Sequence, residues 1–379
     1  LSPREPREGG DLDVTWVTSD VTLDTSLVLS KRTSAPRETS PPSHQACETN
    51  LMDIEQKSLQ ISKTTAPFLR EDGVTERPWL DVPLPMYTKV LWWLLSFAQL
   101  PSSLVFVPDG NRRWAKQRGA PPHFGHIKAS TLMEQVQAAA LLLGVRESFI
   151  FIFSVRNFQR PEEQRVHLFN HMNRAFDSIC NNWEFYQKKD WSFKIRGDLQ
   201  LFPKEVRERE EKLELLTHQT SAKSNIYFCG PYESRHQITR MAVTLCHAIR
   251  DGLLEPSDIT EHLIDRYNEI EDCPQVECYL RTSGERRLSD FMTWQTDRAA
   301  IYFEKKNFPD LGYWDIFKMM LHYSASSSSR KRLDDCYVKA RNRTEQRRSA
   351  AQWLKERKFL SWLETKRHTY LQRLAGDDL

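Results

Sequence analysis

A carboxylate, a glycine and two arginines stand together directly after a short apolar run. Residues 104–107 read as a buried parallel strand, and Asp109, Gly110, Arg112 and Arg113 follow at the start of a segment with helical character. The glycine permits a sharp turn, N–H groups at a helix start can point at an anion, and guanidinium groups match phosphate oxygens. A lone carboxylate would repel a diphosphate, so a bridging Mg²⁺ held by Asp109 and substrate phosphates is expected. An ordinary Asp-Gly turn with solvated arginines is the alternative for this run alone.

A second run, residues 279–291, contains the sequence Arg-Thr-Ser-Gly-Glu. Together the two runs resemble the cis-prenyltransferase family, whose bacterial members are undecaprenyl diphosphate synthases. The resemblance extends from about residue 79 to residue 374, and it is strongest for the eukaryotic branch that makes dehydrodolichyl diphosphate. Further motifs of the family occur between the two runs in the family's order: Gly125-His126, residues 153–160, Gly197-Asp198-Leu199 and residues 234–238.

The resemblance implies an enzyme that uses Mg²⁺ to condense isopentenyl diphosphate onto farnesyl diphosphate. Its product would be a long-chain dehydrodolichyl (polyprenyl) diphosphate for dolichol synthesis and protein glycosylation. The resemblance assigns the metal to Asp109 and links Asn157 to proton loss. Since an amide is a poor base, we expect Asn157 to orient a phosphate oxygen or a water molecule. The residues that the resemblance assigns to substrate binding are Gly110, Asn111, Arg112, Arg113, Trp114, His126, Ser154, Arg160, Arg281, Arg287 and Ser289.

Two diphosphate sites are implied by this assignment. Residues 110–113 would hold the allylic diphosphate, while Arg160, Arg281, Arg287 and Ser289 would hold isopentenyl diphosphate and its neighbour. His126 matches a family histidine near the phosphates, where an imidazolium could donate to them. A structural histidine at a helix start is the other interpretation of that position.

The sequence departs from the family pattern at several positions. Pro108 stands where the family usually has Met, Arg156 where it has Glu, and Ala129 where it has Gly. Residues 121–123, Pro-Pro-His, replace a segment with a phosphate-side arginine, and Ala300 replaces the acid that supplements the metal site of bacterial members. Pro108, Arg156 and Pro122 motivate a second hypothesis, a degenerate non-catalytic paralogue that acts as a binding or regulatory subunit.

The chain alternates short apolar runs with longer helical patterns, which predicts an α/β fold with a mainly parallel central sheet and surrounding helices. We assign residues 79–324 to this catalytic domain. The expected strands are 104–107, 149–153, 193–195, 226–229, 276–280 and 301–303, and the expected helices include 205–218, 235–252 and 313–323.

Composition narrows the partners and the compartment. A formal net charge of +3 does not argue for nucleic acid, and seven cysteines without a framework suit reduced thiols facing the cytosol. No stretch of about twenty apolar residues occurs, so we expect no bilayer-spanning helix. Residues 90–100 are apolar nearly all round, which predicts a helix packed under the domain or lying against a membrane surface.

The two ends of the chain differ in composition from the middle. Residues 1–78 lack a signal-peptide pattern and are expected to be disordered. Residues 325–379 should form a flexible serine run at 326–329 and then a basic hairpin or arm of two helices, which we expect to bind another subunit or anionic lipid rather than nucleic acid. Residues 373–379 lack the Arg-x-Gly motif of homodimeric relatives. The resemblance therefore implies a non-catalytic partner subunit that supplies it, and peripheral contact with the cytosolic face of the endoplasmic reticulum membrane.

Overall fold

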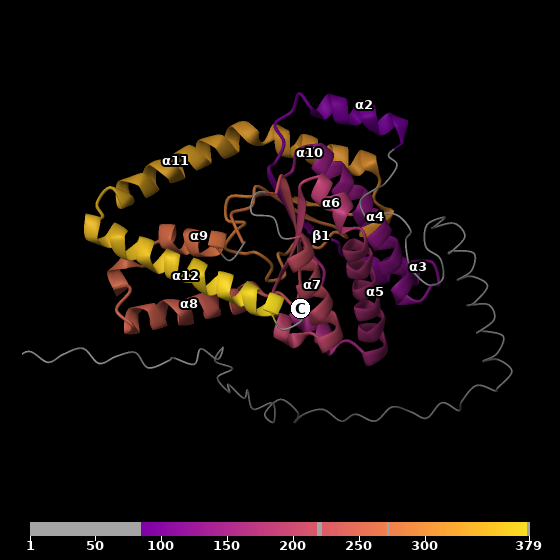
Figure 1. The fold of residues 1–379 in the computed structure, drawn as a ribbon. Helices are drawn as coiled ribbons and strands as arrows, with labels where there is room; N and C mark the ends of the chain where they lie inside the picture. Colours follow the sequence, from indigo (N-terminus) through magenta and orange to yellow (C-terminus); the bar gives the residue numbers. More distant parts are fainter. Residues whose placement is uncertain (1–84, 218–221, 271–272, 377–379) are drawn as a thin grey trace, which may run out of the picture. The chain divides into compact units, whose positions relative to one another are not determined.

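The computed structural model describes residues 85–217, 222–270 and 273–376 (Figure 1). Residues 1–78, for which the sequence predicts disorder, lie outside these ranges. The strands are β1 (Ser103–Val107), β2 (Glu147–Phe151), β3 (Trp191–Arg196), β4 (Ser224–Cys229), β5 (Cys278–Arg281) and β6 (Ala300–Phe303). The helices are α2 (Met86–Leu95), α3 (Asn111–Gln117), α4 (Pro122–Leu142), α5 (Glu162–Asn181), α6 (Trp183–Lys188), α7 (Lys204–Thr217), α8 (Ser234–Arg250), α9 (Glu261–Ile270), α10 (Tyr313–Ala325), α11 (Ser327–Glu345) and α12 (Ala350–Gly376).

The six strands form one sheet in the order β3-β4-β2-β1-β5-β6, and every neighbouring pair is parallel. This confirms the predicted fold class. β1 lies between β2 and β5, with Val105 opposite Phe149 on one side and Tyr279 on the other. Since all strands run the same way, the loops that follow β1, β2 and β5 leave from one edge of the sheet, where ligands of such folds bind.

Alternate residues of β1, β2, β4 and β5 enter two different cores, as the two-residue period of a strand requires. Leu104, Phe106 and Leu280 belong to a large core with residues of α4, α5 and α10. Val105, Val107 and Tyr279 face the other way, into a smaller core that includes Phe291 and Met292 from the segment after β5. The segment after β5 therefore serves both as core and as the support of the site described below.

Two strands begin and end away from their predicted positions. The strand predicted at 149–153 is β2, which begins two residues earlier and ends at Phe151. The earlier start is possible because the polar Ser148 side chain is buried with a partner, donating to the Gln137 side chain (2.7 Å). Phe153 leaves the strand and packs against other phenylalanine rings. The strand predicted at 276–280 is β5, which starts two residues later and ends at Arg281.

Helix α2 occupies most of the apolar segment predicted at 90–100. Thr88, Leu91 and Leu95 are buried on its inner side, which packs against α10. The ring of Tyr313 meets the rings of Tyr87 and Trp92 with centroids 6.2 and 6.3 Å apart. The exposed side is also apolar and carries Met86, Val90, Trp93, Leu94 and Phe97. In the ranges that the structure describes, no helix combines the length and the apolar character needed to cross a membrane.

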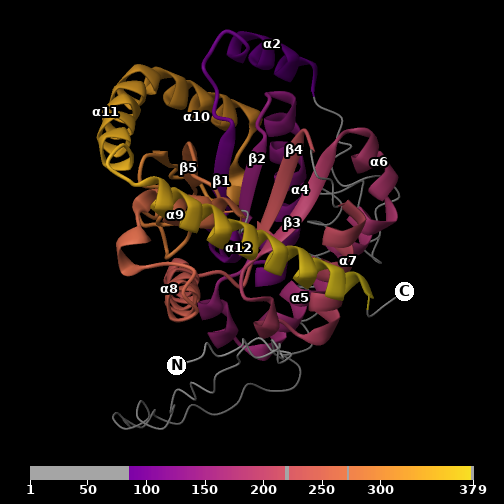
Figure 2. The ribbon, with the colours of Figure 1, turned by 60° about the vertical axis from the view of Figure 1, so that its left-hand side comes forward.

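The C-terminal part contains the two predicted helices, α11 and α12, joined by a short turn (Figures 1 and 2). The prediction of a flexible serine run at 326–329 is wrong, because α11 begins at Ser327. Ser326 ends α10 by donating its hydroxyl to the Tyr323 carbonyl (2.8 Å), and Arg330 donates back to that hydroxyl (3.1 Å). These contacts join α10 to α11 with a single non-helical residue.

Helix α12 packs on its own chain. Phe359 and Leu363 are buried in a cluster with α8 and α9, so the expectation that another molecule would cover this side of the arm is wrong for these two residues. The other buried members of the cluster are Met241, Leu245, Ala248, Leu254, Leu263 and Tyr267.

We predict that Phe359→Ala lowers the free energy of unfolding by about 3 kcal/mol, because it leaves a cavity between α12 and α8 and α9. Urea unfolding followed by circular dichroism measures the change. Leu354→Ala on the exposed side of the same helix is the control and should change stability by less than about 0.5 kcal/mol. Equal losses in the two variants would mean that α12 is not docked as described.

Candidate active site

The ends of β1 and β5 meet at an ion pair. Val107 and Arg281 are opposite each other in the sheet, and Arg281 donates from Nη2 to Oδ2 of Asp109 over 2.8 Å. Arg281 is buried, whereas the Asp109 side chain is 32% exposed and so remains accessible to a ligand. Thr282 reinforces the junction, since its hydroxyl accepts from the Asp109 N–H (2.9 Å) and donates to the Asp109 carbonyl (2.8 Å). The two motifs found in the sequence are thus fixed to each other.

Gly110 occupies a left-handed conformation (φ +96°) at the start of α3. A Cβ at this position would lie 2.4 Å from Oδ1 of Asn307 and 2.8 Å from the Cβ of Ser283. The Gly110 N–H donates to Oδ1 of Asp109 (2.7 Å). The turn therefore requires glycine for both its backbone angle and its space.

The loop after β5 gathers a second group of polar side chains. Arg281 donates to the Ser289 hydroxyl and to the Arg287 carbonyl (2.6 Å). Arg113 of α3 donates to the Ser283 hydroxyl from the opposite side. Ser283 and Ser289 both have positive φ, +71° and +56°, which costs about 1–3 kcal/mol for each residue. Such strain concentrates at functional sites, and here it positions two hydroxyls at two guanidinium groups.

Glu285 links two of the predicted phosphate-binding arginines. Its carboxylate lies 3.3 Å from Arg113 and 2.7 Å from Arg287. The sequence analysis assigned no role to Glu285, although it lies inside the quoted Arg-Thr-Ser-Gly-Glu motif. The sequence did contain a signal for such a role, since Glu285 is a negative charge in the run of residues 279–291, which also holds Arg281 and Arg287.

The loop after β2 supplies the third group. Ser154 precedes a short 3-10 turn over residues 155–159, and the Asn157 side-chain oxygen accepts from the Ser154 N–H (3.2 Å). Asn157 is therefore held by its own turn, which suits an orienting role rather than that of a base. Arg160 follows the turn, with no ion pair to any carboxylate among the described residues.

His126 of α4 lies deep beside this group. Burial, with repulsion from Arg160 and other cations including Arg112, lowers the pKa of the imidazole to about 3. Burial and repulsion from Arg112 also lower the pKa of Arg160, to about 10. The Asn111 side chain approaches Nδ1 of His126 at 3.5 Å. His126 is therefore neutral near pH 7 in this structure, which favours a structural histidine over an imidazolium donor in the free protein.

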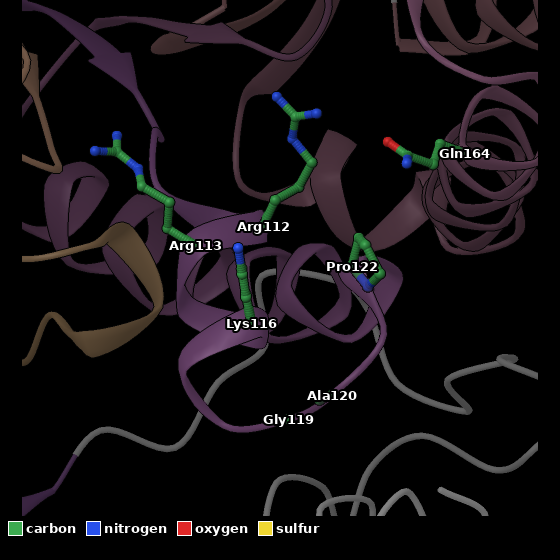
Figure 3. Close-up of a pocket in the computed structure, with 7 residues that line it drawn as sticks. All are labelled: Arg112, Arg113, Lys116, Gly119, Ala120, Pro122 and Gln164. Atoms are coloured by element: carbon green, nitrogen blue, oxygen red, sulfur yellow. The ribbon is translucent and has the colours of Figure 1, made fainter. Parts of the chain in front are cut away.

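A cavity of about 440 Å³ opens beside the start of α3. Figure 3 shows Arg112, Arg113 and Lys116 extending from α3 toward the same open side, with the amide of Gln164 from α5 directed toward Arg112. The lining contains three cations and no carboxylate. This charge favours an anion, and the helix start adds the positive end of its dipole.

Trp114 lies under the turn, buried, with Nε1 donating to Asp310 (2.8 Å). Arg118 stacks on its ring at 4.4 Å and contacts the same carboxylate. The ring supports α3 from below, and its predicted part in substrate binding stays a prediction. Asn307 and Asp310, which the sequence analysis missed, come from the segment after β6 and hold α3 in place.

Of the positions that depart from the family pattern, Pro108 and Arg156 lie in the loops that carry the polar groups, whereas Ala300 pairs with Cys278 at the other end of β5 from Arg281. Pro108 needs no N–H in this turn, and its carbonyl accepts from the Asn111 side chain (3.1 Å). Arg156 is largely exposed and lies 3.8 Å from Glu233. Ala129 is buried on α4, and Ala300 is the first residue of β6.

The fold and these groups together define a cis-prenyltransferase. The undecaprenyl diphosphate synthase family model matches residues 107–331, so the chain belongs to that family of prenyl-transferring enzymes.

Individual relatives agree. The dehydrodolichyl diphosphate synthase complex subunit DHDDS of Homo sapiens is 29% identical over 292 residues, which cover 75% of this chain and 86% of that protein. The corresponding complex subunit of Schizosaccharomyces pombe is 33% identical over 59% of this chain and 85% of its own length. Among solved structures, lavandulyl diphosphate synthase from Lavandula x intermedia, in complex with dimethylallyl diphosphate, superposes with a TM-score of 0.56 at 26% identity, over 59% of this chain and 95% of that one.

We predict that Gly110→Ala abolishes most binding of an allylic diphosphate, at least tenfold in Kd, because the new methyl group would displace Asn307 or Ser283 and strain the turn. Isothermal titration measures the affinity. Gly144→Ala is the matched control, since Gly144 also has positive φ (+88°) but has no atom within 4 Å of its Cβ position. Unchanged affinity in Gly110→Ala would exclude this turn from the site.

A pH prediction follows from His126. Its pKa is lowered on folding, so the unfolded chain binds the proton more tightly below pH 6.5, and stability falls as pH drops from about 6.5 toward 3. Between pH 7 and pH 5 this single group should cost about 2 kcal/mol, and His126→Gln should shrink the difference by that amount. Urea unfolding at the two pH values tests this, with exposed His322→Gln as a control that leaves the difference unchanged. An identical pH response in His126→Gln and the parent protein would contradict it.

Proposed function

We propose that this protein condenses isopentenyl diphosphate onto farnesyl diphosphate and makes a long-chain dehydrodolichyl diphosphate. The observation that carries the proposal is that Asp109 and several arginines meet at one edge of the sheet. These residues come from the ends of three strands, β1, β2 and β5, and from the loops that follow them. The relatives named for dehydrodolichyl diphosphate synthesis support this product class. Dolichol synthesis for protein glycosylation is the pathway we infer.

The arginines of the two inferred subsites differ in how they are paired. In the described part of the chain, Arg112 and Arg160 make no ion pair, so their charges are available to an arriving anion. Arg113 and Arg287 are held by Glu285, and Arg281 is held by Asp109. We infer that Arg112 and Arg113 contribute to the allylic subsite and that Arg160, Arg281 and Arg287 receive isopentenyl diphosphate.

A cluster of phenylalanine rings, of which Phe153 and Phe202 are buried and Phe158 and Phe169 partly exposed, adjoins the loop after β2. The rings of Phe153 and Phe158, which flank Ser154 and Asn157 in sequence, lie 4.9 Å apart by centroid. Phe169 of α5 and Phe202 pack on both of them, at 5.5 to 6.4 Å. This arrangement suits a substrate with a charged head and a hydrocarbon tail, because the tail leaves water as the head reaches the arginines.

Mg²⁺ fits the residues at this site. It needs few carboxylates when substrate phosphates and waters complete its shell, and Asp109 offers one accessible carboxylate. The Asn111 side-chain oxygen is buried without a hydrogen-bond partner, so it could accept from a water of a hydrated ion. When bound, the ion would neutralise charge that develops on the departing diphosphate.

The residues of the chain then divide the work of an ionisation and addition. Arg112, Arg113 and the N–H groups at the start of α3 stabilise the departing allylic diphosphate. Arg281 and Ser289 hold isopentenyl diphosphate so that its double bond faces the allylic carbon. Asn157 orients the phosphate oxygen or water that receives the released proton.

The partner and the location are also proposals. Two relatives are named as complex subunits, so we propose a non-catalytic partner subunit, which would supply the Arg-x-Gly motif of the family. The exposed apolar side of α2, with Trp93 60% and Phe97 76% exposed, supports peripheral contact with the endoplasmic reticulum membrane from the cytosol.

The second candidate, a non-catalytic paralogue, rests on Pro108, Arg156 and Pro122. Arg156 places a cation near Glu233 at a position where the family has an acid, and Pro122 stands in the segment where the family has a phosphate-side arginine. A binding subunit would keep the fold and could still bind a diphosphate, but it would not turn over.

We predict labelled long-chain product from isopentenyl and farnesyl diphosphates with Mg²⁺, increased by a partner subunit of the dehydrodolichyl complex type. Asp109→Asn should lower the rate about 100-fold, because the metal would lose its only protein carboxylate. Exposed Asp251→Asn is the matched control and should keep full activity. Chelation of Mg²⁺ should abolish turnover.

Two results would contradict the proposal. A folded protein that gives no product with or without the partner would favour the non-catalytic paralogue. Full activity in Asp109→Asn would remove Asp109 from the mechanism.

A further inference from the structure

The α11–α12 hairpin has a packed side and a free side. On α11, Tyr337 contacts Glu261 of α9 (3.1 Å) and Arg341 contacts Asp265 of α9 (3.1 Å). On α12, Phe359 and Leu363 are buried against α8 and α9. Residues at these spacings form one stripe on each helix, so the opposite stripes face away from α9.

The free side is strongly basic. Its exposed cations outnumber its exposed acids, which are Asp335 and Glu364 among the residues whose side chains are described. The exposed cations are Lys331, Arg332, Lys339, Arg343, Arg347, Arg357 and Lys358. None of these seven is in an ion pair within the described ranges, in contrast to Arg341, Arg348 and Lys355 on the packed side.

Apolar side chains are interspersed with these cations. Leu354 is 53% exposed and lies one helical turn before Arg357 and Lys358, on the same face of α12. Trp353 and Val338, although 41% and 46% exposed, instead line a cavity with His262 and Arg341 on the packed side. An exposed leucine among Lys and Arg side chains suits the boundary between lipid headgroups and acyl chains.

We propose that the free side of the α11–α12 hairpin is a docking surface for a bilayer that contains anionic phospholipid. Positive side chains meet the negative headgroups, while Leu354 enters the headgroup boundary. A second copy of this chain is disfavoured as occupant, because it would bring two like-charged surfaces together. Nucleic acid would use the cations but would leave the exposed Leu354 side chain without a role.

The surface is separate from the one proposed on α2. The α2 side is apolar with little charge, so its binding should depend weakly on lipid charge and on salt. The hairpin should add a component that requires anionic lipid and that weakens as salt rises, because exposed charges are screened. The proposal rests on the proposed function only in that a prenyl-lipid enzyme works at a membrane, and its test needs no turnover.

The test is sedimentation of the full chain with vesicles of phosphatidylcholine alone or with roughly one third phosphatidylserine. We expect at least tenfold tighter binding to the anionic vesicles at about 0.1 M salt than at about 0.5 M. The variant Arg343→Glu, Arg347→Glu, Arg357→Glu and Lys358→Glu should lose this gain, which is the additional affinity for anionic vesicles at low salt. Its affinity for neutral vesicles should stay the same. The corresponding four-glutamine variant should lose most of it without adding negative charge.

A matched control reverses four exposed cations elsewhere, at Lys188, Lys189, Lys204 and Lys212 on α6 and α7. It has the same net charge as the hairpin variant, so it should retain the gain on anionic vesicles. An equal loss in both variants would mean that net charge alone governs binding and would overturn the proposal. Tighter binding of a generic RNA than of anionic vesicles, lost in the hairpin variant, would also overturn it. Absence of catalytic turnover would leave these results unaffected.

Discussion

The contact between Asp109 and Arg281 is the constraint on which the site depends. It joins residues 172 positions apart in the chain, and it closes the edge where β1 and β5 end. Arg281 is buried, and a buried guanidinium without a partner costs several kcal/mol, so its charge must always be met by an anion. If the proposed metal ion drew Asp109 away, a substrate phosphate would have to take its place at Arg281. Binding of the metal and of substrate would then be coupled through one side chain.

The same logic extends to Glu285. It occupies Arg113 and Arg287, which come from α3 and from the loop after β5 and thus belong to different inferred subsites. A diphosphate that displaces Glu285 from one arginine changes the charge felt by the other. The two subsites therefore share the Glu285 carboxylate. Among the described residues, no carboxylate competes in the same way for Arg112 and Arg160. Each inferred subsite thus has one arginine without such competition, Arg112 in the allylic subsite and Arg160 in the other.

The sequence predicted the parallel sheet and the convergence of the three loops because strand periodicity and motif order are local signals. Element ends were predicted less well. The Ser148–Gln137 hydrogen bond admits a polar residue into β2, and the contacts of Ser326 with α10 and Arg330 convert an expected linker into helix. Both depend on contacts with a neighbouring helix or its end, which no periodicity reveals. Asn307 was missed for the same reason, since its importance comes only from its distance to Gly110.

The departures from the family pattern are compatible with an intact polar centre for identifiable reasons. Pro108 loses an N–H in a turn where that group is not needed, and its carbonyl still accepts from Asn111. Arg156 keeps its charge in solvent near Glu233, away from the buried Arg281. Ala300 lies opposite Cys278, at the other end of β5 from Arg281, while Asp109 remains accessible, and Mg²⁺ tolerates a single protein carboxylate when phosphates complete its shell. The substitutions thus alter the surroundings of the phosphates while the groups that would bind them stay in place.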